Sequence, residues 1–149
     1  MGRVTACKEI TFDCAHMLSG HKALCKNLHG HTYKVQIGIT GEQIVEGSSA
    51  DMVIDFKNLK EVIDRAIISR FDHAIIFSGT EFRNEAENAL FDWAQKYNMR
   101  FFEMPRRTTA EDMSIYFREL ITWEFRHIGY IPAEVNVRVY ETPTSFAEV

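Results

Sequence analysis

Two segments near the start of the chain alternate between apolar and polar residues. In residues 4–16 the even positions are mainly apolar, and in residues 31–40 the odd positions are apolar apart from the first. Neighbouring side chains of a strand point to opposite faces of a sheet, so this period of two predicts two half-buried strands. The positions expected to face inward are Val4, Ala6, Lys8, Ile10, Phe12, Cys14, His16, His31, Tyr33, Val35, Ile37 and Ile39.

Three later segments repeat apolar residues at the spacing of an amphipathic helix. The first follows Asp55, a suitable N-cap, and the third opens with a capping box at residues 108–111. The second covers residues 84–97, with Glu85 and Glu87 near its start, where the helix dipole favours anions. The positions expected to face inward are Phe56, Leu59, Val62, Ile63, Ala66 and Ile67, then Ala86, Leu90, Trp93, Ala94 and Tyr97, then Met113, Tyr116, Phe117, Leu120, Ile121 and Phe125.

Alternation returns near the end of the chain and completes the expected fold. Residues 133–140 read as a strand that Pro143 should end, residues 145–148 as a short last strand, and residues 99–102 as a short extended piece. The resulting order of strands and helices predicts an α+β fold, an antiparallel sheet with helices packed on one face. A chain of 149 residues is long enough for one domain with a real core, so we expect a single domain over residues 1–149.

Composition excludes several classes of protein. The hydrophobic content of 46% is ordinary, and no apolar run approaches the roughly 18 residues of a membrane span. The first residues lack the apolar core of a signal peptide, so we expect a cytoplasmic protein with no membrane partner. Three cysteines without a framework spacing fit reduced thiols. A net charge of −4 argues against a general nucleic-acid binder.

The stretch Cys25-Lys-Asn-Leu-His29-Gly-His31 carries the strongest chemical signal. Residues two apart on a strand point to the same side, so His29 and His31 can bind one cation together. If the first two strands pair antiparallel, His16 at the end of the first strand converges on the same point. Three imidazoles with an open fourth position are typical of catalytic zinc. The alternative is that the three histidines are only polar residues at strand ends.

Cys25 lies in the connection formed by residues 17–28, which is long for a hairpin and therefore a candidate functional loop. A nearby dication and imidazoles would lower the pKa of the thiol and populate the thiolate, so we expect Cys25 to act as a base or nucleophile. Two alternatives are a fourth, structural ligand and an ordinary loop thiol. The first would describe a zinc-stabilised binding module without turnover.

Two further groups are candidates for chemistry or binding. Asp72 and His73 are adjacent and can act as a proton-transfer unit, although a solvated pair in a loop is equally compatible with the sequence. Glu141 continues the apolar face of the strand at 133–140, where a carboxylate is costly without hydrogen-bond donors. A heterocycle edge with two parallel N–H donors would satisfy both of its oxygens. The alternative is that the strand end has already reached solvent.

Two short basic clusters could receive an anionic phosphate chain, or could be ordinary solvated surface. They consist of His21, Lys22 and Lys26 near Cys25, and of Arg106 and Arg107. A cupin-type dioxygenase, which also places His-x-His on a strand, is disfavoured because the carboxylate expected a few residues later is absent from the sequence there.

These motifs resemble the superfamily of 6-pyruvoyl-tetrahydropterin and 6-carboxy-5,6,7,8-tetrahydropterin synthases over nearly the whole chain. The matching pieces are Phe12-Asp-Cys-Ala-His16, Cys25-Lys-Asn-Leu-His29-Gly-His31, Val53-Ile-Asp55-Phe56, Phe71-Asp72-His73, Thr108-Thr-Ala-Glu111-Asp112 and Glu141-Thr-Pro-Thr-Ser145. The resemblance implies a zinc ion held by His16, His29 and His31, catalysis by Cys25, Asp72 and His73, and substrate binding by Glu141, Thr108 and Thr109.

Within this superfamily the Cys-x3-His-Gly-His spacing resembles the bacterial carboxy-tetrahydropterin branch. That branch converts 7,8-dihydroneopterin triphosphate to 6-carboxy-5,6,7,8-tetrahydropterin, acetaldehyde and triphosphate, on the route to queuosine. A pyruvoyl synthase and a side-chain aldolase remain alternatives. The resemblance also implies a tunnelling fold whose sheets join into an oligomeric barrel, as a homohexamer made of two trimers. Two features differ from the family pattern: Cys14 replaces a small alanine, and the segment 78–104 is longer.

Overall fold

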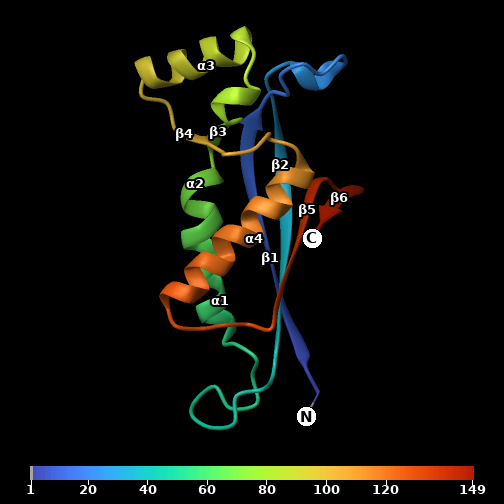
Figure 1. Ribbon diagram of the computed structural model, residues 1–149, viewed down its shortest axis with the longest axis vertical. Helices are drawn as coiled ribbons and strands as arrows, with labels where there is room; N and C mark the ends of the chain where they lie inside the picture. Colours follow the sequence, from blue (N-terminus) through green and yellow to red (C-terminus); the bar gives the residue numbers. More distant parts are fainter. Residues whose placement is uncertain (1) are drawn as a thin grey trace.

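The computed structural model describes residues 2–149 and contains one six-stranded sheet with helices on one side (Figure 1). The strands are β1 (Val4–His16), β2 (His29–Gly41), β3 (Ala74–Phe77), β4 (Phe101–Glu103), β5 (Glu134–Thr142) and β6 (Ser145–Glu148). The helices are α1 (Phe56–Ile63), α2 (Ser69–Phe71), α3 (Glu85–Lys96) and α4 (Ala110–His127), with a π-helix η2 (Asp64–Ile68) and 3-10 turns η1 (Leu24–Lys26) and η3 (Thr80–Phe82). No helix among residues 2–149 has the length and apolar character needed to cross a membrane.

The sheet is mixed, so the prediction of an antiparallel sheet is wrong. Its strand order is β4-β3-β1-β2-β5-β6. The pairs β1–β2, β2–β5 and β5–β6 are antiparallel, whereas β3 runs parallel to β1 and β4 runs parallel to β3. The sequence pattern missed β3 because Ala74-Ile-Ile-Phe77 is a short apolar run without alternation. Parallel strands covered on both faces commonly have this character.

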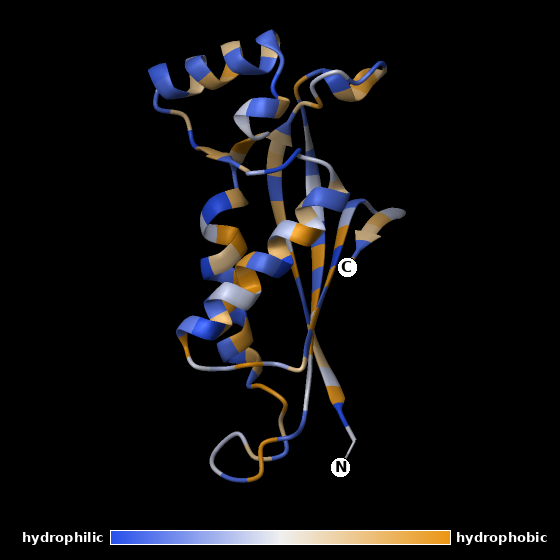
Figure 2. Cartoon of the chain, in the orientation of Figure 1, coloured by the Kyte–Doolittle hydropathy of each residue, from blue (hydrophilic) through white to orange (hydrophobic). Residues whose placement is uncertain are grey.

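The core lies between the sheet and the helices α1, α2 and α4, which cover one face (Figure 1). The alternation predicted for β1 and β2 is present, and Figure 2 shows it as alternating colours along these strands. The inward positions near the middle of β2, from Tyr33 to Ile39, are fully buried. Phe12 on β1 stacks on Tyr33, with ring centroids 5.3 Å apart. Burial of these side chains supplies the main favourable term in folding.

The helix that follows Asp55 begins as predicted, because the Asp55 carboxylate accepts a hydrogen bond of 2.8 Å from the Lys57 amide. It then continues through the π-helix η2 into α2 and ends at Phe71. The predicted inward residues of this segment are buried except Phe56, which is 57% exposed. The extension to Phe71 determines where the chain turns back, and so places Asp72 beside β1.

The inward face predicted for α3 is only partly right, because Ala94 is buried and Leu90 is half-buried, but Ala86 is exposed. Its buried residues are Glu87 and Ala94, whereas Trp93 and Tyr97 are largely exposed. The helix lies beyond the end of the sheet rather than over its face (Figure 1). Phe91 packs edge-on against Phe77 of β3, with centroids 5.1 Å apart. This contact rotates the helix relative to the orientation that its apolar residues alone would favour.

Candidate metal and pterin site

Pairing of β1 with β2 brings three imidazoles together at one end of the sheet. His16 is the direct partner of His29 in the antiparallel register, and Cys14 is the partner of His31. The ring centroids lie 4.6 Å apart for His16 and His29, 4.8 Å for His29 and His31, and 5.2 Å for His16 and His31. One ligand atom from each ring and one from Glu141 all lie within 4.8 Å of one another. The predicted convergence is therefore present in the fold, and Glu141 adds a fourth potential donor.

The Nδ1 atoms of two rings are held by backbone carbonyls. His16 Nδ1 lies 2.9 Å from the Thr108 carbonyl oxygen, and His29 Nδ1 lies 2.7 Å from the Asn27 carbonyl oxygen. A carbonyl only accepts, so each Nδ1 carries a proton and each neutral ring presents a lone pair at Nε2. The two Nε2 atoms are 3.1 Å apart. Two lone pairs facing each other at this distance are stabilised by a shared proton or metal ion, and such carbonyl tethers are typical of metal-ligating histidines.

The ring of His31 also presents a nitrogen atom without a hydrogen-bond partner. His31 Nε2 is buried and makes no hydrogen bond. It lies 3.0 Å from Glu141 Oε1, but the geometry of this contact is not that of a hydrogen bond. Burial lowers the pKa of His31, and His29 lowers it further, while Glu141 acts in the opposite direction. Burial, followed by the nearby His29, lowers the pKa of His16 to about 4. Neutral imidazole is the ligating form, so this donor set fits zinc.

The low pKa of His16 predicts that the metal-free protein is sensitive to acid. Between about pH 4 and pH 6.5, His16 is protonated in the unfolded chain but neutral in the native protein. The free energy of unfolding therefore falls as the pH decreases across this window. The loss attributable to His16 amounts to roughly 3 kcal/mol at most. Urea unfolding at pH 7 and pH 5 should give a smaller pH-dependent change for His16→Asn than for wild type. Equal changes in the two proteins would contradict this prediction.

Cys25 lies in η1, within the loop that joins β1 to β2, and it is half-buried. Its carbonyl accepts a hydrogen bond of 2.8 Å from the Leu18 amide, which closes the loop on itself. The thiol is not a member of the compact ligand group formed within residues 2–149. This separation favours the interpretation of Cys25 as a reactive thiol over that of a fourth ligand.

Tyr33 is a site residue that the sequence pattern marked only as core. Its hydroxyl is fully buried beneath the cluster, 3.5 Å from His16 Nε2. Burial raises the pKa of Tyr33, and the neighbouring Cys14, Glu141 and Cys25 raise it further. The phenol therefore stays protonated and can donate into the site. The signal available in the sequence was its position on the same face as His31, two residues away.

The two threonines expected to bind substrate have structural partners in this fold. Thr108 is fully buried, and its hydroxyl lies 3.2 Å from His16 Nδ1, beside the contact made by its carbonyl. Thr109 caps α4 by accepting a hydrogen bond of 3.2 Å from the Asp112 amide. The cap is one residue later than the predicted capping box, which leaves Thr108 free to hold His16. Contact of either threonine with substrate stays a prediction.

Asp72 and His73 form a pair at the edge of β1. Asp72 Oδ1 lies 3.0 Å from His73 Nδ1 and accepts a hydrogen bond of 3.3 Å from the Asp13 amide. The His73 amide donates in turn to the Asp13 carbonyl, at 2.7 Å. His73 has a φ of +59°, a left-handed conformation that few non-glycine residues adopt. His73 and His31 both line a pocket of about 480 Å³, whereas Asp72, His16 and His29 are not part of its lining.

The basic candidates differ in their contacts. Arg106 pairs with Glu119 at 2.9 Å, and Arg107 donates a hydrogen bond of 2.6 Å to the Ser19 carbonyl. Lys22 and Lys26 are exposed on the loop that carries Cys25. These two lysines keep their ammonium groups in solvent, where a phosphate chain could reach them.

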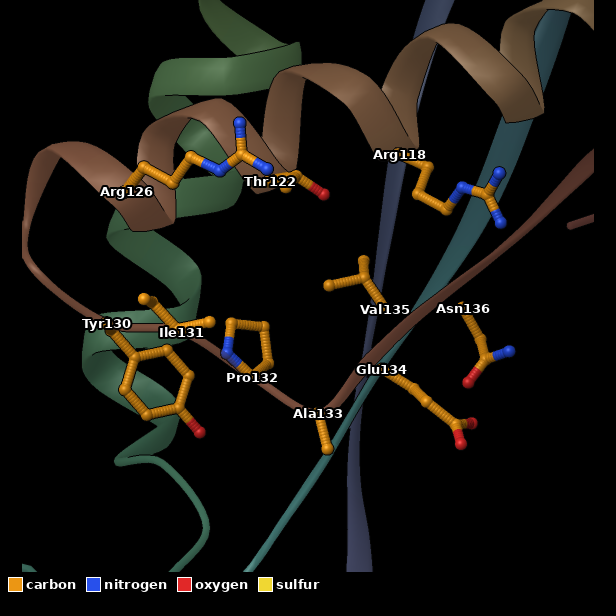
Figure 3. A pocket seen from close by; sticks show the side chains of 10 residues that line it. All are labelled: Arg118, Thr122, Arg126, Tyr130, Ile131, Pro132, Ala133, Glu134, Val135 and Asn136. Carbon is orange, nitrogen blue, oxygen red and sulfur yellow. The ribbon is translucent and has the colours of Figure 1, made fainter.

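A different pocket, of about 380 Å³, lies between α4 and the segment that leads into β5 (Figure 3). Arg118 and Arg126 project from α4 at its rim, and Tyr130 and Pro132 line it from below. Its lining contains neither an imidazole nor a thiol. The cluster of histidines at the other end of β5 is therefore the better candidate for catalysis.

The strand ends of this sheet gather three imidazoles and a carboxylate, a group that could hold a metal ion, and the protein is an enzyme of the tetrahydropterin synthase class. The family model described as "6-pyruvoyl tetrahydropterin synthase" matches residues 5–149, and the chain belongs to this family. It is 41% identical to the 6-carboxy-5,6,7,8-tetrahydropterin synthase of Haemophilus influenzae, over 95% of this chain and 94% of that protein. It is 30% identical to the Rickettsia felis protein of the same name, over 95% of this chain and 96% of that one.

Solved structures of the family share the fold. A catalytic-residue variant of the Plasmodium vivax 6-pyruvoyltetrahydropterin synthase superimposes with a TM-score of 0.74, at 20% identity, over 100% of this chain and 98% of that one. The Caenorhabditis elegans 6-pyruvoyl tetrahydropterin synthase gives a TM-score of 0.65, at 22% identity, over 100% of this chain and 96% of that one. At these sequence identities the structural similarity shows only that the fold is shared.

Proposed function

We propose that this protein converts 7,8-dihydroneopterin triphosphate and water to 6-carboxy-5,6,7,8-tetrahydropterin, acetaldehyde and triphosphate. The observation that carries the proposal is the pair of Nε2 lone pairs, 3.1 Å apart, beside the unpartnered Nε2 of His31. The carboxy-tetrahydropterin branch is supported by the relatives of that name. The Cys-x3-His-Gly-His spacing supports the same branch.

Zinc held by His16, His29 and His31 would supply Lewis-acid polarisation of the side-chain oxygens of the substrate. The thiolate of Cys25 removes a proton from the side chain, from a loop that borders the cluster. His73 exchanges a proton on the other side, with Asp72 Oδ1 holding its Nδ1 at 3.0 Å. This contact fixes the orientation of the imidazole and leaves Nε2 free for the transfer.

Glu141 recognises the pterin in this proposal. Its side chain is 25% exposed, so the carboxylate can be reached from solvent while its backbone is held in β5. The guanidine-like edge of a pterin offers two parallel N–H donors, which match the two oxygens of a carboxylate. Tyr33 lies beneath the same cluster and excludes water from this side.

The decisive assay is incubation of the purified, metal-loaded protein with 7,8-dihydroneopterin triphosphate, followed by mass analysis of the pterin and detection of acetaldehyde. We expect carboxy-tetrahydropterin and one acetaldehyde for each triphosphate released. A pyruvoyl pterin without acetaldehyde would identify the pyruvoyl synthase reaction instead. Retention of the side-chain carbons as a different aldehyde, with the triphosphate intact, would indicate an aldolase. Metal binding without turnover would support the alternative that the protein is a zinc-stabilised binding module.

Glu141→Gln should raise KM for the pterin substrate by roughly 10- to 100-fold, because one N–H donor of the substrate then faces an amide NH2. The metal content should stay at the wild-type level, and kcat should change less than KM. Glu134→Gln, an exposed position on the same strand, serves as the control. Loss of the metal from Glu141→Gln would assign the carboxylate to the metal, which its distance of 3.0 Å from His31 Nε2 also allows.

We further propose a cytoplasmic homohexamer, assembled as two trimers, that acts in the supply of 7-deazapurine precursors such as that of queuosine. The support is the family resemblance together with the position of β4 and β6 as the outer strands, each paired on one side only among residues 2–149, so that a neighbouring copy could extend the sheet. Sedimentation of the active protein tests the assembly. Full activity in a species of monomer mass would refute it.

A further inference from the structure

The carboxylate of Glu87 is fully buried, although α3 lies at the edge of the molecule. Burial raises the pKa of this carboxyl, while hydrogen bonds from Ser78 and Ser19 and the charge of Arg83 lower it. An acid in such a position is costly, and an apolar residue would fill the space without that cost. The contacts of Glu87 therefore indicate what the carboxylate contributes.

Glu87 joins two distant parts of the chain through a single oxygen. Its Oε1 accepts hydrogen bonds from the Ser19 hydroxyl at 3.3 Å and the Ser78 hydroxyl at 3.4 Å. Ser19 lies in the loop between β1 and β2, and Ser78 directly follows β3. Figure 1 places α3 and this loop at the same end of the molecule. The loop is thus attached to the core through the carboxylate.

Two other groups hold the same serine. The Asn84 amide donates to the Ser19 hydroxyl at 3.1 Å, and Arg107 donates to the Ser19 carbonyl at 2.6 Å. Ser19 is 7% exposed, whereas most of the loop that follows it is open to solvent. Ser19 is consequently the fixed point from which this loop extends.

Ser19 directly follows Leu18, whose amide holds the backbone of Cys25. The Leu18 amide donates to the Cys25 carbonyl at 2.8 Å, so the backbone that Ser19 anchors also holds the backbone of the cysteine. The path from Glu87 to the thiol therefore passes through two hydrogen bonds and one peptide unit.

We propose that Glu87 is a positioning residue, whose carboxylate fixes Ser19 and thereby holds the Cys25 loop in its reactive placement. This inference rests on the proposed function in that Cys25 is the base. Segment 78–104 contains α3, and α3 supplies the acceptor oxygen that holds the loop. A displacement of about 1 Å in a reacting group is enough to cost roughly 10²-fold in rate.

The test compares Glu87→Ala, Glu87→Gln and Ser19→Ala with wild type. We expect kcat to fall by roughly 10- to 100-fold in Glu87→Ala and Ser19→Ala, with KM and metal content little changed. Glu87→Gln keeps an acceptor oxygen for the serine hydroxyls and should retain most of the activity. Glu85→Ala, an exposed acid on the same helix, is the matched control.

Alkylation of thiols by iodoacetamide, mapped by mass spectrometry, reports on the loop without reference to turnover. Labelling of Cys25 should accelerate in Glu87→Ala and Ser19→Ala, because the released loop exposes a half-buried thiol. The exposed Cys7 on β1 supplies an internal reference whose rate should stay constant. Ser19→Ala removes the hydrogen bond between Ser19 and Glu87 from the loop side, so the proposal can still be tested if Glu87→Ala does not fold.

The outcomes separate this inference from the proposed function. Unchanged labelling of Cys25 together with unchanged turnover in both alanine variants would overturn the positioning role. Equal loss in Glu87→Gln and Glu87→Ala would also overturn it, since an acceptor would then be insufficient. Faster labelling of Cys25 in a protein whose wild type does not process the pterin would refute the proposed reaction and support the attachment of the loop.

Discussion

Cys25→Ala should lower kcat for 7,8-dihydroneopterin triphosphate by about 10³-fold, because removal of a positioned base typically costs 10²- to 10⁴-fold. The metal should remain, since the thiol lies outside the ligand group formed by the three histidines and Glu141. KM should change little, because the thiol acts on a proton that is transferred and not on the groups that bind the pterin. Steady-state kinetics and metal analysis of the same preparation check both parts.

Cys7→Ala is the natural control, because this cysteine is exposed on β1 and lies across the sheet from the histidine face. It should retain full activity and full metal content. Loss of the metal from Cys25→Ala would instead assign the thiol to the ion and favour the zinc-stabilised module. Retention of both metal and turnover would remove Cys25 from the mechanism altogether.

His29→Ala should abolish stoichiometric metal binding and reduce turnover to background. The change deletes one of the two lone pairs that face each other 3.1 Å apart. Changes to groups that only support a ligand cost roughly 10- to 100-fold in metal affinity, so loss of a ligand should exceed that range. His29 is preferable to His16 for this test because its ring is only half-buried, so the variant should fold. Elemental analysis after dialysis against a weak chelator gives the metal content.

The matched control is His127→Ala, an exposed imidazole at the end of α4, which should leave metal and activity unchanged. Chelation of wild type and readdition of zinc should remove and restore turnover. An active His29→Ala protein with full metal content would contradict the three-imidazole site. An active wild type without any metal would refute the zinc-dependent mechanism.

The local patterns of the sequence predicted most elements because each depends on neighbours in the chain. Alternation identified β1, β2, β5 and β6, and helical spacing identified α1, α3 and α4. The short strand β3 was not predicted, because its four residues are apolar on both faces and therefore show no alternation. The start of α4 was predicted one residue early, because Thr108 and Thr109 are both suitable caps. Only the contact of Thr108 with His16, which lies 92 residues away in the chain, decides between them.

Glu87 illustrates a limit of pattern-based prediction. A glutamate near the start of a helix interacts favourably with the helix dipole while it remains in solvent, so no local pattern predicts its burial. Its burial depends on Ser19 and Ser78, which approach only when the chain is folded. The positive φ of His73 is likewise invisible in the sequence, since it arises where α2 turns back toward β1.

The sequence by itself determined which residues share a face, because the period of a strand depends only on adjacent positions. His16 on one strand and His29 and His31 on the next were therefore assigned to one side of the sheet. The tertiary structure decided the register, in which His16 pairs directly with His29, and it added the carbonyl tethers and Glu141. Register and tethers depend on contacts between distant segments, and these form only when the core packs.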